Sequence, residues 1–226
     1  MSKPVSFGRK RFYYTIEKKL ALLISTIFHP VMLPTLFFAF AACVKPDILS
    51  PFSNSELQLR FILLIFITTM IIPLIMLSIH FMLSKRKLTM EMLYLQNSKD
   101  RIYPFFHTGV FYAGITYLFY SNLHFNPFIC AFMGMASCAV LLSAGISFFY
   151  KISAHTLALS ALTGYLFLLH FFLPETDLLI SACVLIFITG ITASSRLFLN
   201  AHTIGQITVG FLVGLCCTLS CIVWFY

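Results

Sequence analysis

The chain has 226 residues, of which 60% are hydrophobic and only 10% are charged, and its mean hydropathy is +0.94. Soluble globular domains carry about 25% charged residues, so this composition excludes a soluble protein and indicates an integral membrane protein. The formal net charge of +8 does not indicate nucleic-acid binding, because the apolar runs leave no soluble basic domain. Retention of basic loops in the cytoplasm and binding of anionic lipid or phosphate explain the charge better.

Residues 1–19 form a basic, aromatic leader that we expect to lie on the cytoplasmic membrane surface. From residue 20 to residue 226 the chain reads as one transmembrane domain. A helix needs about 20 apolar residues to cross the hydrocarbon core, and this rule predicts an all-α polytopic bundle of six to seven spans. The candidate spans are Leu20–Val44, Leu59–Leu83, Tyr103–Tyr120, Pro127–Tyr150, His155–Leu173, Leu178–Ser194 and His202–Tyr226.

Two of these runs carry further signals. The first contains His29-Pro30 and Pro34, so we expect it to kink or to be partly re-entrant. The last contains Gly210 and Gly214 in a GxxxG pattern, which allows close approach of a neighbouring helix.

The loops between the spans differ in charge. If all seven runs cross, the leader, residues 84–102, residues 151–154 and residues 195–201 share one side, with six, five, one and one Lys or Arg. The other side has only Lys45 and Arg60. The positive-inside rule therefore predicts a cytoplasmic N-terminus, and we expect the protein in a bacterial inner membrane.

Ionisable groups gather at the mouths of helices on this same side. The segment Ser195–Gln206 brings an Arg and a His to one helix mouth, and the segment Lys151–His155 brings a Lys, a Ser and a His to another. One helical hairpin separates these two segments and another separates them from the basic loop at residues 84–102, so all three loops face the same side whatever its direction. The residues that the two segments and the basic loop contribute are Arg101, Lys151, Ser153, His155, Arg196 and His202.

Such a set suits phosphoryl transfer through a covalent histidine. Arg binds phosphate through paired hydrogen bonds and Lys as a point charge, while helix N-termini add backbone N–H donors. One imidazole attacks the phosphorus and the other protonates the leaving oxygen. This chemistry needs no cofactor and no metal, and the seven Cys make no CxxC pair or Cys/His ligand spacing.

The two segments resemble motifs of the type 2 phosphatidic acid phosphatase superfamily, which includes the vanadium haloperoxidases. Ser195, Arg196, His202 and Gln206 stand at the positions of its Ser-Arg-x5-His-x3-Asp motif, and Ile152-Ser153-Ala154-His155 is similar to its Pro-Ser-Gly-His motif. Its Lys-x6-Arg-Pro motif is suggested only by Lys99–Pro104. The resemblance covers a phosphatase-like core at about residues 99–214.

The resemblance implies a role for each residue. His202 would be the nucleophile that forms a phosphohistidine, His155 the general acid, and Gln206 would orient the His202 ring from the position of the family's acid. The phosphate would be held by Arg196, Arg101, Ser153 and Lys151. The implied substrate is a phosphorylated lipid, such as a prenyl carrier, a phosphatidate-like lipid or lipid A, and the implied reaction is metal-independent hydrolysis of a phosphate monoester or pyrophosphate.

Gln206 departs from the family, because an amide supplies no negative charge to the ring, and Asp100 or Glu91 would have to take over that function. A second interpretation is therefore a catalytically impaired member that binds phosphorylated lipid or supports a membrane partner. A third is a small transporter, against which stand the absence of an inverted repeat and of a midplane acid. Among the scattered histidines, His107 is the predicted additional site residue, because it lies one turn into its helix on the motif side.

Overall fold

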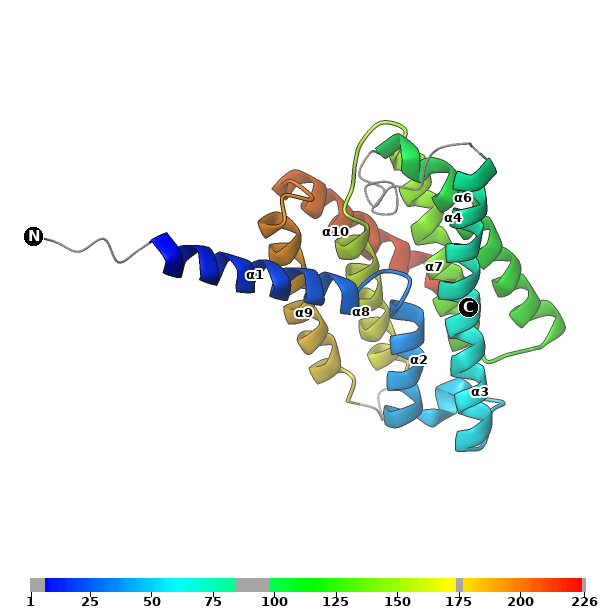
Figure 1. Ribbon diagram of the computed structural model, residues 1–226. Helices are drawn as coiled ribbons and strands as arrows, with labels where there is room; N and C mark the ends of the chain where they lie inside the picture. The colour runs from blue at the N-terminus through cyan, green and yellow to red at the C-terminus, as the bar shows by residue number, and fades with distance from the viewer. Residues whose placement is uncertain (1–6, 84–97, 174–176, 225–226) are drawn as a thin grey trace, which may run out of the picture.

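The computed structural model describes the backbone of residues 7–83, 98–173 and 177–224. Over these ranges the chain is helical and contains no β-strand, which confirms the predicted all-α class (Figure 1). Residues 1–6 of the leader and residues 84–97 of the basic loop, including Glu91, lie outside the described ranges.

The first apolar run is broken at its His-Pro pair. Helix α1 (Phe7–Ile27) ends just before His29, and α2 (Leu33–Val44) begins three residues after Pro30. Proline has no N–H and disfavours helical geometry in the residue before it, which accounts for the break. Figure 1 shows α1 and α2 running in different directions, with α1 extending away from the bundle. The kink is thus confirmed, but the predicted division between a surface leader and a span at residue 19 falls inside the continuous helix α1.

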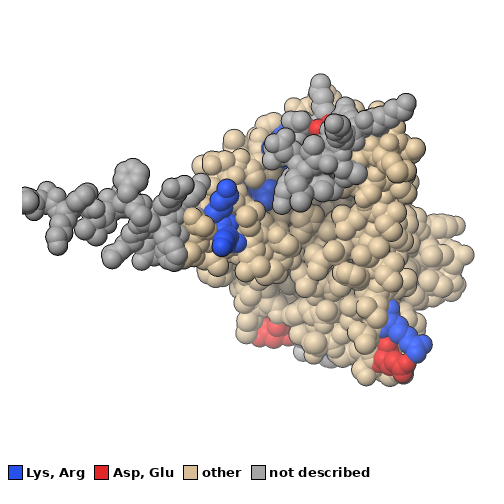
Figure 2. Space-filling model, in the orientation of Figure 1, with Lys and Arg blue, Asp and Glu red and all other residues tan. Residues whose placement is uncertain are grey.

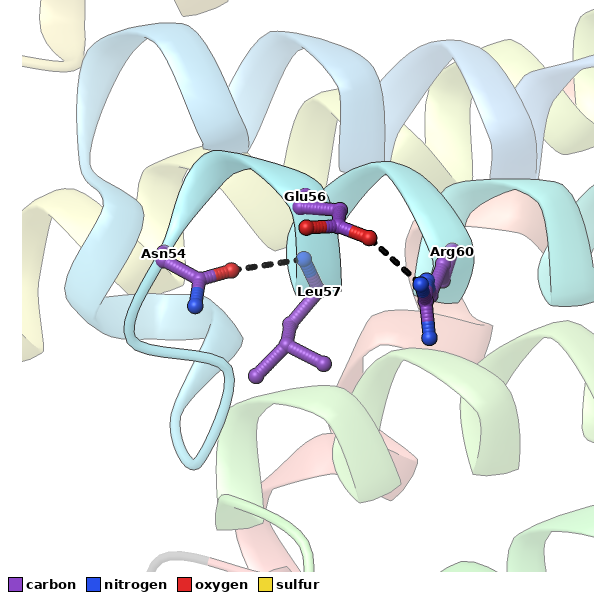
Figure 3. Close-up of polar contacts among 4 residues, drawn as sticks. All are labelled: Asn54, Glu56, Leu57 and Arg60. Atoms are coloured by element: carbon purple, nitrogen blue, oxygen red, sulfur yellow. Dashed lines mark hydrogen bonds and ion pairs between the residues drawn. The ribbon is translucent and has the colours of Figure 1, made fainter.

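A short 3₁₀ helix, η1 (Pro46–Leu49), leads to a long interrupted helix. It consists of α3 (Ser55–Phe66), the π-helical segment η2 (Ile67–Ile71) and α4 (Ile72–Leu83). Asn54 caps its start, because its Oδ1 accepts a hydrogen bond from the Leu57 N–H at 2.8 Å (Figure 3). One turn later Arg60 pairs with Glu56 on the surface.

The π-helical segment has a specific hydrogen-bond partner. Pro73 lacks the N–H that would normally bond the carbonyl four residues earlier, which is that of Thr69. Tyr112 supplies the missing donor: its buried hydroxyl donates to the Thr69 carbonyl at 2.6 Å. The bond joins η2 to α6 (Ser98–Tyr117), the helix that begins with the Arg101 region.

Replacing Tyr112 with Phe is therefore expected to destabilise the protein by about 1–3 kcal/mol, the cost of a buried carbonyl left without a donor. The measurement is the thermal midpoint of the purified protein in detergent. Tyr117→Phe is the matched control on the same helix, because Tyr117 is 69% exposed. Equal midpoints for the two variants would contradict the role assigned to Tyr112.

The remaining helices form the bundle around the motif segments. They are η3 (Leu118–Asn122), α7 (Pro127–Ile146), α8 (Ala154–Phe172), α9 (Leu179–Phe198), α10 (Ile204–Thr218) and η4 (Leu219–Trp224). Helix α6 packs against α7, and α8 packs against both α9 and α10.

Within the described ranges, five helices are long and apolar enough to cross a membrane. They are Ser55–Leu83, Pro127–Ile146, Ala154–Phe172, Leu179–Phe198 and Ile204–Ile222. The predicted spans Leu20–Val44 and Tyr103–Tyr120 have no counterpart among these five helices. The first run is divided and leaves only the short apolar helix α2. The second run corresponds to α6 and η3. The structure thus supports an integral membrane protein, and the count of six to seven spans stays a prediction.

The charged side chains lie in separate places. On the face shown in Figure 2, they lie over α1 and at the two ends of the bundle, and the broad surface between consists of other residues. At the α2–α3 end, both basic residues have an acidic partner: Lys45 lies 3.2 Å from Asp47, and Arg60 pairs with Glu56. The uncharged band between the two ends is the surface expected to face the lipid chains.

Candidate functional site

The connection between α9 and α10 places Arg196 and His202. Asn200 adopts a left-handed conformation (φ 52°), which Asn tolerates better than most residues. The Ala201 N–H donates to the Arg196 carbonyl at 3.0 Å and the Asn200 N–H donates to the Leu197 carbonyl at 2.9 Å, which is the Schellman arrangement of a helix end. Arg196 therefore lies in the last turn of α9, and His202 follows six residues later, just before the Thr203 cap of α10. We expected His202 to begin the helix itself, and it lies two residues outside.

Gln206 holds the His202 ring. Its Oε1 lies 3.0 Å from His202 Nδ1 and 3.4 Å from the Thr203 backbone nitrogen, as part of a capping box. A backbone N–H can only donate, so the amide oxygen is the atom that faces both groups. His202 Nδ1 must then carry the proton that Gln206 accepts. In the neutral ring this leaves Nε2 with a free lone pair, as a nucleophile requires.

The start of α8 lies directly against α10. The Ser153 N–H donates to the Gln206 carbonyl at 3.1 Å. A Cβ atom added at Gly210 would lie 2.7 Å from the Ser153 carbonyl oxygen, and one added at Gly214 would overlap the Leu157 carbonyl oxygen. The close approach predicted from the GxxxG pattern is thus confirmed, with α8 as the partner helix.

Ser153 itself has a structural role. It is fully buried at the N-cap of α8, and its Oγ accepts from the Thr156 N–H at 3.5 Å. Neither Ser153 nor Lys151 lines the cavity of about 480 Å³ beside His202. Phosphate binding by these two side chains remains a prediction.

The positive charges of the site act on one another. Burial lowers the pKa of His202 to about 4; the Gln206 hydrogen bond opposes this, and the charges of Arg101, Arg196 and Lys151 add to the lowering. Burial lowers the pKa of Lys151 as well, and the same two Arg residues add to it. His202 is therefore neutral near pH 7. A bound anion would offset the mutual repulsion of the cations, so the cluster favours a negatively charged ligand.

Arg101 reaches the motif segments from α6. Arg101 is 7% exposed, and its guanidinium donates to the Ile152 carbonyl at 3.1 Å, which ties α6 to the connection before α8. Arg101, His155, Arg196 and His202 all line one cavity of about 480 Å³. The structure therefore brings together four of the seven predicted site residues around one space, with Gln206 behind His202.

The break between α1 and α2 contributes a part of the site that we did not predict. His155 Nε2 lies 3.0 Å from the Ser25 carbonyl oxygen, which can only accept, so Nε2 carries a proton. The His29 ring meets the His155 ring edge to face, with centroids 5.2 Å apart. Ser25 and His29 both line the cavity. The His29-Pro30 pair signalled a break in the sequence, but nothing in the sequence placed that break against His155.

His107 is not part of this site. Its Nδ1 lies 2.8 Å from the Tyr103 carbonyl oxygen in its own helix, its side chain is exposed, and it does not line the cavity. The prediction from its place in the helix was wrong because it lies on a different face of α6 from Arg101.

The rest of the cavity is mostly apolar. It extends from the cations along α6 and α7, past Tyr112 on α6 and Ala136 and Phe132 on α7. Helix α8 contributes Leu162 two turns below His155. The site thus joins a cationic mouth to an apolar interior.

Comparisons with protein-family models, with curated proteins and with solved structures found no match to this chain. Among the residues that the structure describes, no group of three or more His, Cys, Asp or Glu is arranged to hold a metal ion.

Proposed function

We propose that this protein is a divergent member of the type 2 phosphatidic acid phosphatase superfamily and hydrolyses a lipid phosphate or pyrophosphate through a phosphohistidine. One observation carries the proposal. His202, with Nδ1–H bound to the Gln206 oxygen, lines the same cavity as Arg101, Arg196 and His155. A neutral imidazole beside two guanidinium groups is what a nucleophile directed at a phosphate needs.

The reaction would proceed in two steps. The lone pair on His202 Nε2 attacks phosphorus, the phosphorus–oxygen bond to the lipid breaks, and the departing oxygen takes a proton from His155. Water then attacks the phosphohistidine and gives its proton to His155, which releases inorganic phosphate and restores His202. Arg101 and Arg196 would stabilise the charge on the phosphoryl oxygens in both steps.

His155 must be doubly protonated to act as the acid. Its Nε2–H now points to the Ser25 carbonyl. The negative charge of a bound phosphate would favour the imidazolium form, and an oxygen of the substrate would replace the Ser25 carbonyl as acceptor. Ser25 would thus hold the ring in place between turnovers.

The test is phosphate release from a panel of lipid phosphates by purified protein without added metal, for wild type and three Gln206 variants. Gln206→Glu keeps the side-chain length and adds a charge, so we expect release to rise about tenfold, because a charge-assisted hydrogen bond is worth about 1–1.5 kcal/mol more than a neutral one. Gln206→Asp, the family residue, should also raise release. Gln206→Leu removes the acceptor and should lower it.

The second candidate function is binding of phosphorylated lipid without hydrolysis, and the uncharged Gln206 is the observation that favours it. No release by the wild type, together with release by Gln206→Glu, would identify an impaired catalyst on an intact scaffold. No release by any variant, with lipid phosphate still bound, would support the binding function.

The proposal also includes a topology. If α1–α2 and α6 cross the membrane in addition to the five helices, the chain crosses seven times, and the site and the N-terminus lie together in the cytoplasm of a bacterial cell, on the side where most Lys and Arg gather. In a variant without its native Cys, we expect a membrane-impermeant maleimide added to intact cells to label Ser53→Cys and not Phe149→Cys. Both positions are exposed and lie at opposite ends of the bundle. The reverse labelling pattern would place the site on the outer face.

A further inference from the structure

The apolar part of the cavity is deep and narrow. On α6 its lining runs from Arg101 to Tyr112, and on α7 from Ser143 to Phe132. Eleven helical positions at about 1.5 Å each make roughly 16 Å, about half of the ~30 Å hydrocarbon core. The space therefore extends from the cationic mouth as far as one leaflet of a bilayer is deep.

The volume of the cavity limits the size of the ligand that it can enclose. About 480 Å³, divided by the roughly 30 Å³ that one water-sized group occupies in a liquid, corresponds to about 16 non-hydrogen atoms. Because the phosphate takes about four of these atoms, the cavity has room for about 12 carbon atoms of one hydrocarbon chain and for no second chain. Small side chains on facing helices, Ala136 and Ala139 on α7 and Ala158 and Ala161 on α8, leave this space open.

A second observation at the mouth points to a ligand. The Ser25 hydroxyl is buried, lines the cavity, and has no hydrogen-bond partner among the described residues. Buried hydroxyls are nearly always paired. Because the Ser25 carbonyl already accepts from His155, the free hydroxyl lies beside the proposed acid, where an oxygen of a bound phosphate ester could pair with it.

The cavity also reaches the lipid-facing surface. Leu22 on α1 and Leu74 on α4 line it and are 42% and 41% exposed. A chain already in the bilayer could enter sideways between these helices.

We propose that the cavity binds the phosphate ester of a single apolar chain of about 12 carbon atoms or fewer. The phosphate lies among Arg101, Arg196 and His202, and the chain lies along α6, α7 and α8. The proposal rests on the proposed function for the identity of the headgroup, and it adds the size and number of the chains. Two-chain lipid phosphates are then poor ligands.

The test measures binding, so it does not depend on catalysis. Affinities of dodecylphosphonate and butylphosphonate, which cannot be hydrolysed at the carbon–phosphorus bond, are measured by calorimetry in detergent for wild type, Ala136→Phe and Leu142→Phe. Ala136 lines the cavity, whereas Leu142 lies on the same helix and is 41% exposed outside it. The preference for the long chain should fall about tenfold or more in Ala136→Phe, because the new ring excludes several methylenes, and should not fall in Leu142→Phe.

The chain-length and chain-number dependence completes the test. Wild type should bind dodecylphosphonate more tightly than docosylphosphonate and a two-chain phosphonate analogue of phosphatidate. Equal affinity for the one-chain and two-chain ligands, or an unchanged long-chain preference in folded Ala136→Phe, would overturn the proposal even if phosphate release is found. Binding with the expected pattern but without release from any ester would keep it and contradict the enzymatic function.

Discussion

Replacing His202 with Ala is expected to lower phosphate release by at least about 10⁴-fold, because the route through a covalent intermediate is then lost. Release is measured from the best substrate of the lipid phosphate panel. In rapid-quench samples, wild type should carry phosphate on a histidine, stable in base and labile in acid, and His202→Ala should carry none.

His107→Ala is the matched control, because His107 is exposed and lies outside the cavity. It should retain wild-type release. Binding of dodecylphosphonate by His202→Ala should persist, since Arg101 and Arg196 remain. Substantial release by His202→Ala would contradict the phosphohistidine mechanism, whereas loss of both release and binding would show that His202 is needed for the fold of the site.

Replacing Gly214 with Leu is expected to have the largest effect on stability. Even a Cβ atom there would overlap the Leu157 carbonyl oxygen and the Ser160 side chain. The α8 and α10 helices would have to separate, at a cost of about 1–3 kcal/mol or more. Separation also weakens the hydrogen bond from the Ser153 N–H to the Gln206 carbonyl, so His155 and His202 would no longer share the cavity in their present arrangement.

We therefore expect a lower thermal midpoint and loss of phosphate release in Gly214→Leu. Gly190→Leu on α9 is the control, because a Cβ atom added at Gly190 meets nothing within 4 Å. It should be close to wild type in both measurements. A normal thermal midpoint in Gly214→Leu would mean that the tight contact between α8 and α10 does not hold the site together.

The amino-acid sequence by itself determined the class of this protein and the order of its helices. Long apolar runs have few stable alternatives to helices in a membrane, because every backbone N–H and carbonyl must be paired internally. The His29-Pro30 break and the Gly210/Gly214 close approach also follow from local chemistry, since a missing N–H and a missing Cβ act wherever they occur. The same locality brought Arg196 and His202 to one helix connection.

The tertiary structure decided which residues meet. Periodicity cannot say that the carbonyl of Ser25, at the end of α1, lies against His155, because their contact spans 130 positions in the chain. Nor could periodicity exclude His107, which lies at the same depth in α6 as a site residue should but on a different face of the helix from Arg101. The direction of the Gln206 amide was also beyond the sequence: an amide can present either its oxygen or its nitrogen to a ring, and only the capping N–H of Thr203 selects the oxygen. The apolar cavity, finally, is a property of four or more helices together, because it consists of the space that their small side chains leave unfilled.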